Sequence, residues 1–203
     1  MDGTYILFQP PASAGSCYFN YKGGHTIVLL VVADAKYRFN YEDVGVNGRV
    51  SDGGVFRETS VAAAIARNLL QFPADKSLPG RDIHVPFVFV ADDAFPFTDG
   101  IMKPFPFADL TLERLYNYHL SRARRVVENA FGILSNRFRI FLTTINLAPE
   151  KEEAVTLAAV SLHNFRGTNM PAPNVEDFNA LPGLPEQEGN RPGNLAYNIR
   201  NEF

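Results

Sequence analysis

The sequence predicts an α/β domain in which strands and helices pack as layers. The first part of the chain carries short runs rich in β-branched and aromatic residues, which are typical of strands. Further along, apolar residues recur at steps of three and four over residues 111–135, which predicts one face of a long helix. Strand-like runs come before and between the helical segments, and this order is that of α/β folds.

Three strands or strand-like runs are expected near the amino terminus. Residues 4–8 form the first run, which stops before a pair of prolines. Residues 25–33 are almost wholly apolar, as expected of a strand that is covered on both faces. The link at 34–36 is too short for a parallel crossover, so the strand over 37–44 should pair with 25–33 in the antiparallel sense.

Helices and short strands are expected to alternate through the rest of the chain. Ser51 can cap a helix that continues to about Leu70, with a break near Thr59. Residues 71–86 hold three prolines and predict a surface loop, and 87–91 predict a short buried strand. The remaining expectations are a short strand at 101–102, the long helix to Ser135, an extended or irregular stretch over 137–144, and a helix from Pro149 to about Asn164.

Composition favours a folded protein in an intracellular setting. Apolar residues make up 46% of the 203 residues, which excludes a largely disordered chain. Cys17 is the only cysteine, so an internal disulfide is impossible. No apolar run approaches the roughly 18 residues of a membrane span, and the start has no signal-peptide layout. Prolines and asparagines are frequent from Met170 on, which predicts one domain over 1–168 followed by a flexible tail over 169–203.

Charge is unevenly distributed along the chain. The net charge is −3, and the segment from Met170 onward carries all of it, so the preceding part is balanced. Between residues 113 and 139 there are six arginines and two glutamates, which makes the long helix and its exit basic. That suits a polyanionic partner, although solvated arginines on a helix surface would give the same pattern.

Three carboxylates occupy positions from which a metal site could be assembled. Asp2 precedes the apolar run of the first strand, Asp92 follows a later strand, and Glu128 projects from the long helix. Together they would repel one another unless a cation joined them. Oxygen ligands suit Mg²⁺ or Mn²⁺, and two such ions about 4 Å apart can support phosphodiester cleavage. Spacing alone does not establish that the three groups meet. Taken by itself, Glu128 is more simply one partner of a surface ion pair with arginines one turn away.

Six motifs in a fixed order connect the chain with a known family. They are Asp2-Gly-Thr, Asn20-Tyr-Lys22, Ser51-Asp-Gly53, Val90-Ala-Asp-Asp-Ala-Phe-Pro96, the stretch from Asn117 to Gly132, and Leu162-His-Asn164. This joint pattern resembles the Harbinger transposase-derived nuclease family of the DDE endonuclease superfamily. The resemblance runs from about Asp2 to Asn164, which is most of the chain.

The resemblance implies a ribonuclease-H-like fold, with a mixed sheet and helices on both faces. It also implies a metal-dependent DNA endonuclease that hydrolyses phosphodiester bonds by a two-metal DDE mechanism. By position, Asp2, Asp92 and Glu128 match the catalytic residues and metal ligands, with two Mg²⁺ or Mn²⁺ ions as cofactors. The implied partners are DNA and a separate Myb-like DNA-binding protein, and the implied location is the nucleus, with the cytoplasm as an alternative.

Several other residues carry weaker assignments. Arg124, Arg125, Arg137 and Arg139 are candidate DNA contacts. Asp52 lies in a matched motif, but a position at a helix start explains it equally well. Asp93 is more simply a cap or turn residue beside Asp92, and His163 is more simply structural. Two departures from the family pattern are Tyr5, where histidine is frequent, and Ala91, where glycine is frequent.

The start of the chain raises an alternative. Members of the family carry a helical DNA-binding region upstream of the catalytic domain, whereas this chain begins at the first catalytic aspartate. The sequence therefore predicts an N-terminally truncated domain in which Asp2 frays from the sheet. The alternative function is that of a catalytically inactive domesticated or truncated copy, which keeps the fold and binds a protein or DNA.

Overall fold

The structure is a computed structural model that describes residues 1–78, 80, 82–106, 111–169 and 200. These residues form a mixed α/β structure with small sheets and helices, as the sequence predicts. They group into two compact units, each made of two separate segments of the chain. Unit 1 comprises residues 1–55 and 125–183, and unit 2 comprises residues 56–124 and 184–203.

Unit 1 contains an antiparallel sheet of three strands in the order β1-β2-β3. The strands are β1 (Asp2–Leu7), β2 (Thr26–Ala33) and β3 (Phe39–Asn47). The central strand β2 is buried along nearly its whole length, which explains its unbroken apolar sequence. The expected antiparallel pairing of β2 with the strand that follows it is confirmed.

The β1 ladder extends to the second residue of the chain. Asp2 lies opposite Val31 of β2, and its exposed fraction is 9%. The expectation that Asp2 frays is therefore wrong for this structure, because pairing with β2 holds the strand to its first residue. Strand alternation also places Asp2 on the same face of the sheet as Ile6, which belongs to the core.

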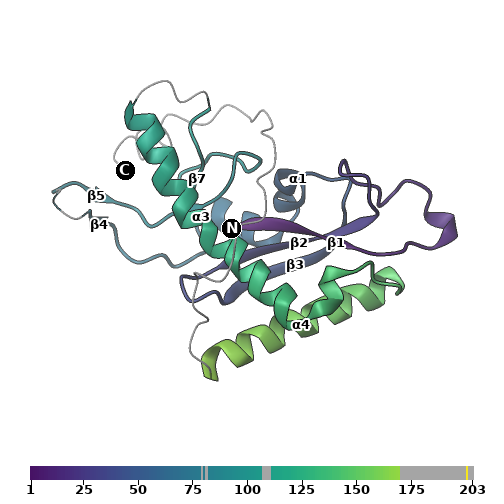
Figure 1. Cartoon of the computed structure of the whole chain (residues 1–203). Coiled ribbons are helices and arrows are strands. Elements are labelled where there is room, and N and C mark those ends of the chain that lie inside the picture. The colour runs from purple at the N-terminus through teal and green to yellow at the C-terminus, as the bar shows by residue number, and fades with distance from the viewer. Residues whose placement is uncertain (79, 81, 107–110, 170–199, 201–203) are drawn as a thin grey trace. The chain divides into compact units, whose positions relative to one another are not determined.

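Two helices contribute to the same core. The carboxyl-terminal part of α3 (Thr111–Arg137) contributes Val127, Ala130 and Leu134, and α4 (Pro149–Asn169) contributes Ala159 and Val160. Figure 1 shows α4 running along one face of the sheet beside β3. A short 3₁₀ turn, η2 (Arg139–Leu142), occupies part of the stretch expected to be irregular.

Two side chains near the end of the last predicted helix fasten α4 to β3. Asn164 donates to the carbonyl of Phe39 at 2.8 Å and accepts from its amide at 2.9 Å. His163 is 2% exposed, and its Nε2 lies 2.7 Å from the carbonyl oxygen of Tyr37. The structural interpretation of His163 is thus supported. The expected helix end at Asn164 is wrong because its amide bonds β3 and does not act as a cap, and α4 continues to Asn169.

Unit 2 is built from short elements. The predicted break in the helix is confirmed, because α1 (Asp52–Arg57) and α2 (Ser60–Ala66) are separate. The residues of α1 up to Val55 belong to unit 1 and the later ones to unit 2. Thr59 caps α2, since its hydroxyl accepts from the amide of Ala62 at 3.2 Å. The expected surface loop over 71–86 is wrong in part, because β4 (Lys76–Ser77) pairs antiparallel with β5 (His84–Val85).

The second short sheet of unit 2 is parallel. It joins β6 (Phe89–Val90) to β7 (Ile101–Met102), where a short strand was expected. The strand predicted over 87–91 is shorter than expected, and β6 is half-buried. Beside it, a cluster of buried side chains comprises Phe97, Met102 and Leu120. The amino-terminal part of α3 belongs to this unit.

The tail of the chain is described at two positions only. The predicted flexible tail over 169–203 lies outside the described residues, apart from Asn169, which ends α4, and Arg200. In unit 2 the guanidinium carbon of Arg200 lies 3.5 Å from the ring centroid of Phe105 and 4.4 Å from that of Phe97. Among the described helices, none is sufficiently long and apolar to cross a membrane.

Candidate metal centre

Two carboxylates of unit 1, separated by 50 residues of sequence, lie close together. Asp2 is supplied by β1, and Asp52 is the first residue of α1. A carboxylate oxygen of each lies within 4.8 Å of one from the other. Asp2 is almost fully buried and Asp52 is half-buried, so neither charge is freely screened by water. Two carboxylates held in this way favour a bound cation between them.

Gly3, which follows Asp2 in β1, makes the close approach of the Asp2 and Asp52 carboxylates possible. A Cβ atom at Gly3 would lie 2.5 Å from Oδ1 and 2.7 Å from Cγ of Asp52, which is closer than van der Waals contact allows. The Asp52 carboxylate therefore occupies the space that a side chain at position 3 would fill. The amide of Gly3 also donates to Oδ1 of Asp2 at 2.9 Å. Gly3 thus donates a hydrogen bond to Asp2 and leaves room for the carboxylate of Asp52.

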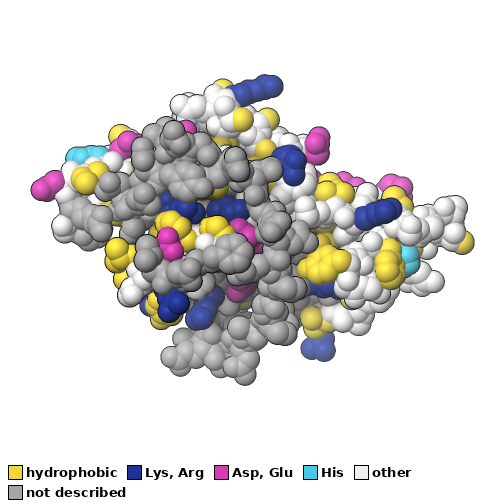
Figure 2. All heavy atoms as spheres, turned by 90° about the horizontal axis from the view of Figure 1, so that it is seen from above, with side chains coloured by type: hydrophobic (Ala, Val, Ile, Leu, Met, Phe, Trp, Pro, Cys, Tyr) yellow, Lys and Arg dark blue, Asp and Glu magenta, His cyan; other side chains and the backbone are white. Residues whose placement is uncertain are grey.

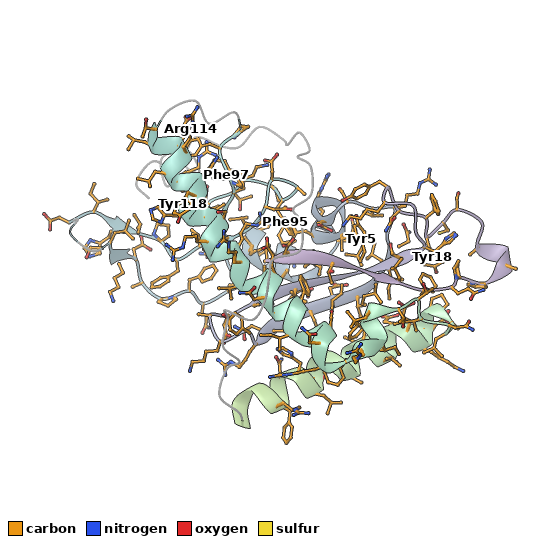
Figure 3. All side chains as sticks on the ribbon, in the orientation of Figure 1. Tyr5, Tyr18, Phe95, Phe97, Arg114 and Tyr118 are labelled. Atoms are coloured by element: carbon orange, nitrogen blue, oxygen red, sulfur yellow. The ribbon has the colours of Figure 1, made fainter. Side chains whose placement is uncertain are left out.

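Tyr5 lies on the same face of β1 as Gly3 and is close to Asp52. It is two residues beyond Gly3, so its side chain is on the strand face where a Cβ atom at Gly3 would meet Asp52. Figure 3 labels Tyr5 beside β1. Burial raises the pKa of the Tyr5 phenol well above its usual value, and the nearby charge of Asp52 raises it further. The phenol is therefore neutral and adds no charge of its own beside the two carboxylates. Two carboxylates with a neutral hydroxyl nearby suit a hard divalent cation such as Mg²⁺ or Mn²⁺.

The two adjacent aspartates of unit 2 have different partners. Asp93 pairs with Lys103 at 2.8 Å, and the Lys103 ammonium also donates to the carbonyl oxygens of Asp93 and Phe95. Lys103 is 6% exposed, so this pair is part of the buried framework. Asp92 follows β6, accepts from the amide of Ala94 at 3.0 Å, and lies 3.9 Å from a guanidinium nitrogen of Arg124. The structural reading of Asp93 is supported, and Asp92 is the aspartate with the looser ion pair.

Glu128 and the candidate DNA contacts are spread along α3 and η2. Glu128 is exposed and lies one turn after Arg124. Arg125 and Arg139 are exposed as well. Arg137 instead donates to the carbonyl oxygen of His163 at 3.5 Å, and burial together with the charge of Arg166 lowers its pKa. On the face seen in Figure 2, the visible basic side chains lie in several separate places.

Sequence reasoning placed Asp52 second to the other acids, and the structure places it beside Asp2. The signal was present in two of the matched motifs, Asp2-Gly-Thr and Ser51-Asp-Gly53, which carry the two carboxylates and the small residue between them. Of the predicted triad, Asp2 and Glu128 belong to unit 1 and Asp92 to unit 2. Their assembly into one site stays a prediction.

Comparison with known proteins connects the chain to one group of nucleases. A family model described as "DDE superfamily endonuclease" matches residues 1–164. The human and bovine proteins named "Putative nuclease HARBI1" are each 25% identical over 168 residues, and the Xenopus laevis protein of that name is 23% identical. Each match covers 81% of this chain and 44% of the relative, so the chain spans less than half the length of these relatives. No solved structure matches the chain.

Proposed function

Because the chain belongs to the DDE superfamily endonucleases, we propose that it is a divalent-metal-dependent nuclease that hydrolyses phosphodiester bonds in DNA. Membership of this family implies the use of a divalent metal. The observation that carries the proposal is the Asp2 and Asp52 pair, whose carboxylate oxygens approach within 4.8 Å because Gly3 has no side chain. Two carboxylates at this separation can share a bound divalent cation.

The proposed ligand set combines this pair with the predicted triad. Asp2 and Asp52 hold the ion in unit 1, and Asp92 and Glu128 complete the set. Two features support the inclusion of Glu128 and Asp92. Asp2 lies on the sheet face that Val127 of α3 covers, and Glu128 follows Val127 in that helix. Asp93, the competitor of Asp92, is already committed to Lys103.

The chemistry divides between the metal and the chain. Divalent ions bound there, Mg²⁺ or Mn²⁺ and two in number under this proposal, would lower the pKa of a water nucleophile and neutralise charge on the phosphate. Asp2 and Asp52 would bind these ions and fix their positions, because strand pairing and the start of α1 hold the backbones of the two residues in place. Arg124 holds the Asp92 carboxylate by an ion pair that is long enough, at 3.9 Å, to yield to a stronger partner.

The wider setting is part of the same proposal. The ribonuclease-H-like fold, with helices on both faces of a mixed sheet, follows from the family. We propose in addition, from the resemblance of the motifs, that the chain is of the Harbinger type, that it works with a Myb-like DNA-binding partner and that it acts in the nucleus. The matched relatives are more than twice as long as the matched part of this chain, so the activity and partners of the whole protein rest on this proposal and on its tests.

The decisive experiment is metal-dependent nicking of supercoiled plasmid DNA by the purified chain. We expect nicking with Mg²⁺ or Mn²⁺ and none in EDTA. Asp92→Asn and Glu128→Gln should each abolish nicking while leaving the melting temperature in EDTA close to that of the wild type, because neither side chain belongs to the buried core. Asp75→Asn is the matched control, since Asp75 is an exposed aspartate of unit 2 outside the proposed site.

Two outcomes would contradict the proposal. Full nicking by Asp92→Asn would exclude Asp92 as a ligand. A wild-type chain that neither binds Mn²⁺ in calorimetry nor nicks DNA would remove the catalytic proposal, and the interaction-domain alternative would then take its place.

A further inference from the structure

A tight turn ahead of β2 fixes the position of a lysine. The side chain of Asn20 is 4% exposed, and its oxygen accepts from the amides of Lys22 at 2.9 Å and Gly24 at 3.1 Å. Its amide nitrogen donates to the hydroxyl of Thr26 at 3.1 Å, at the start of β2. Gly23 takes a φ of 84°, in the region that favours glycine. The turn therefore has one well-defined conformation, anchored to the sheet.

This turn directs Lys22 over the two tyrosines beside the carboxylate pair. The ammonium nitrogen of Lys22 lies 5.3 Å from the ring centroid of Tyr5 and 5.9 Å from that of Tyr21. The two rings meet edge to face, with centroids 5.9 Å apart. Tyr21 is 60% exposed and Lys22 is exposed, and among the described residues no carboxylate pairs with Lys22. The Lys22 ammonium and the exposed ring of Tyr21 are thus both accessible at the same place on the surface of unit 1.

The cluster lies along β1 from the Asp52 carboxylate, on the strand face that carries Gly3 and Tyr5. Tyr5 is two residues from Gly3 on β1, a rise of about 7 Å along the strand. A nucleic-acid strand cleaved at the carboxylates would continue past Lys22 on this side of the sheet. All of these residues belong to unit 1.

We propose that Lys22, Tyr5 and Tyr21 form a binding subsite for the nucleic-acid strand next to the scissile phosphate. Lys22 neutralises a backbone phosphate, and the exposed ring of Tyr21 packs against a base or sugar of the same strand. The subsite deepens the proposed nuclease function and rests on it for the direction of the strand. Its contribution is positioning, because phosphate contacts fix register and carry no sequence information by themselves.

A simpler view is that the lysine only stabilises the loop by cation–π contacts. Such contacts are worth about 0.5–1 kcal/mol at exposed sites, so they would be seen in thermal stability. A phosphate contact would be seen in the salt dependence of DNA binding, because each neutralised phosphate releases counterions. The two roles therefore have different readouts.

The test compares DNA binding by the wild-type chain, Lys22→Gln and Lys22→Arg. Fluorescence anisotropy is measured across a salt series with a short labelled single-stranded oligonucleotide and with its duplex, in EDTA, so that binding is independent of metal and of cleavage. Lys22→Gln should weaken binding and reduce the slope of log K against log salt by about 0.7 for the single strand and about 0.9 for the duplex. Lys22→Arg should restore the slope, because it keeps the charge.

The matched control is Lys36→Gln. Lys36 is also exposed, and it lies in the turn between β2 and β3, at the other end of the sheet from the Asn20 turn. It should leave affinity and slope unchanged. Equal slopes for Lys22→Gln and the wild type would overturn the subsite, and a lowered melting temperature in that case would assign Lys22 to loop stability. A reduced slope for Lys22→Gln in a chain that neither binds Mn²⁺ nor nicks DNA would leave the nucleic-acid contact of Lys22 standing and remove the nuclease proposal.

Discussion

Replacing Gly3 with alanine tests whether the space beside β1 is what positions Asp52 for a metal. The new Cβ would lie 2.5 Å from Oδ1 of Asp52, whereas ordinary van der Waals contact begins at 3.4 Å. The carboxylate must therefore retreat by roughly 0.9 Å, the difference between these distances. The backbone of β1 has little freedom to move instead, because Gly3 is paired with Leu30 of β2.

This displacement should affect metal binding far more than folding. Asp52 is half-buried, so its side chain can turn away at a cost of less than about 1 kcal/mol, the usual range for substitutions outside the core. A ligand misplaced by about 1 Å can cost a functional site about 100-fold. We therefore expect Gly3→Ala to lower Mn²⁺ affinity and nicking rate by about 100-fold, while its melting temperature in EDTA stays close to that of the wild type.

Calorimetric titration with Mn²⁺ and melting curves with and without metal measure these two effects. Gly100→Ala is the matched control, because its Cβ would meet only a methyl group of Ile65 at 3.1 Å within unit 2. It should leave Mn²⁺ affinity unchanged. If Gly3→Ala binds Mn²⁺ as tightly as the wild type, Asp52 is not a metal ligand in this position and the argument from the Gly3 contact fails.

Two further predictions concern stability. Glu152 of α4 is fully buried without a hydrogen-bond partner among the described residues, and burial raises its pKa from 4.5 to about 8. The folded state therefore holds this proton more tightly than the unfolded state, so the stability it confers is full below pH 4.5 and is lost as the pH rises toward 8. Glu152→Gln should remove that loss, worth at most about 5 kcal/mol, and flatten urea-unfolding stability between these pH values; an unchanged pH dependence would contradict it. Arg200→Ala should lower stability by about 0.5–2 kcal/mol through loss of its contacts with Phe97 and Phe105, whereas an unchanged melting temperature would favour a dispensable tail.

The sequence predicted those elements whose pattern reflects local physics. Residues 25–33 had to be a covered strand because they are apolar without alternation, and a three-residue link left only antiparallel pairing with the next strand. The long helix was visible from its periodicity and runs two residues beyond the expected Ser135. In each case one local property decided the outcome, and no contact distant in sequence could reverse it.

The errors arise where a distant contact outweighs a local preference. Asn164 has the chemistry of a helix end, but its amide bonds the backbone of Phe39, which is 125 residues earlier, and the helix continues. The prolines at 73 and 86 are typical of a loop, yet they flank a short ladder between β4 and β5. Asn164 is compatible with a helix end or a helix interior, and the prolines with a loop or the flank of a strand. Contacts distant in sequence decide which of the two forms.

Asp52 illustrates why the site was harder to predict than the fold. An aspartate at the first residue of a helix is favourable on electrostatic grounds alone, so its presence in a motif distinguished nothing. The distinguishing fact is steric and belongs to another strand: only a residue without a side chain at position 3 admits the carboxylate beside Asp2. A cap needs no such space, because its carboxylate faces the amides of its own helix. The requirement for glycine in one motif therefore supports the ligand role proposed for the aspartate of another, and this link becomes visible only when β1 and α1 are placed together within unit 1.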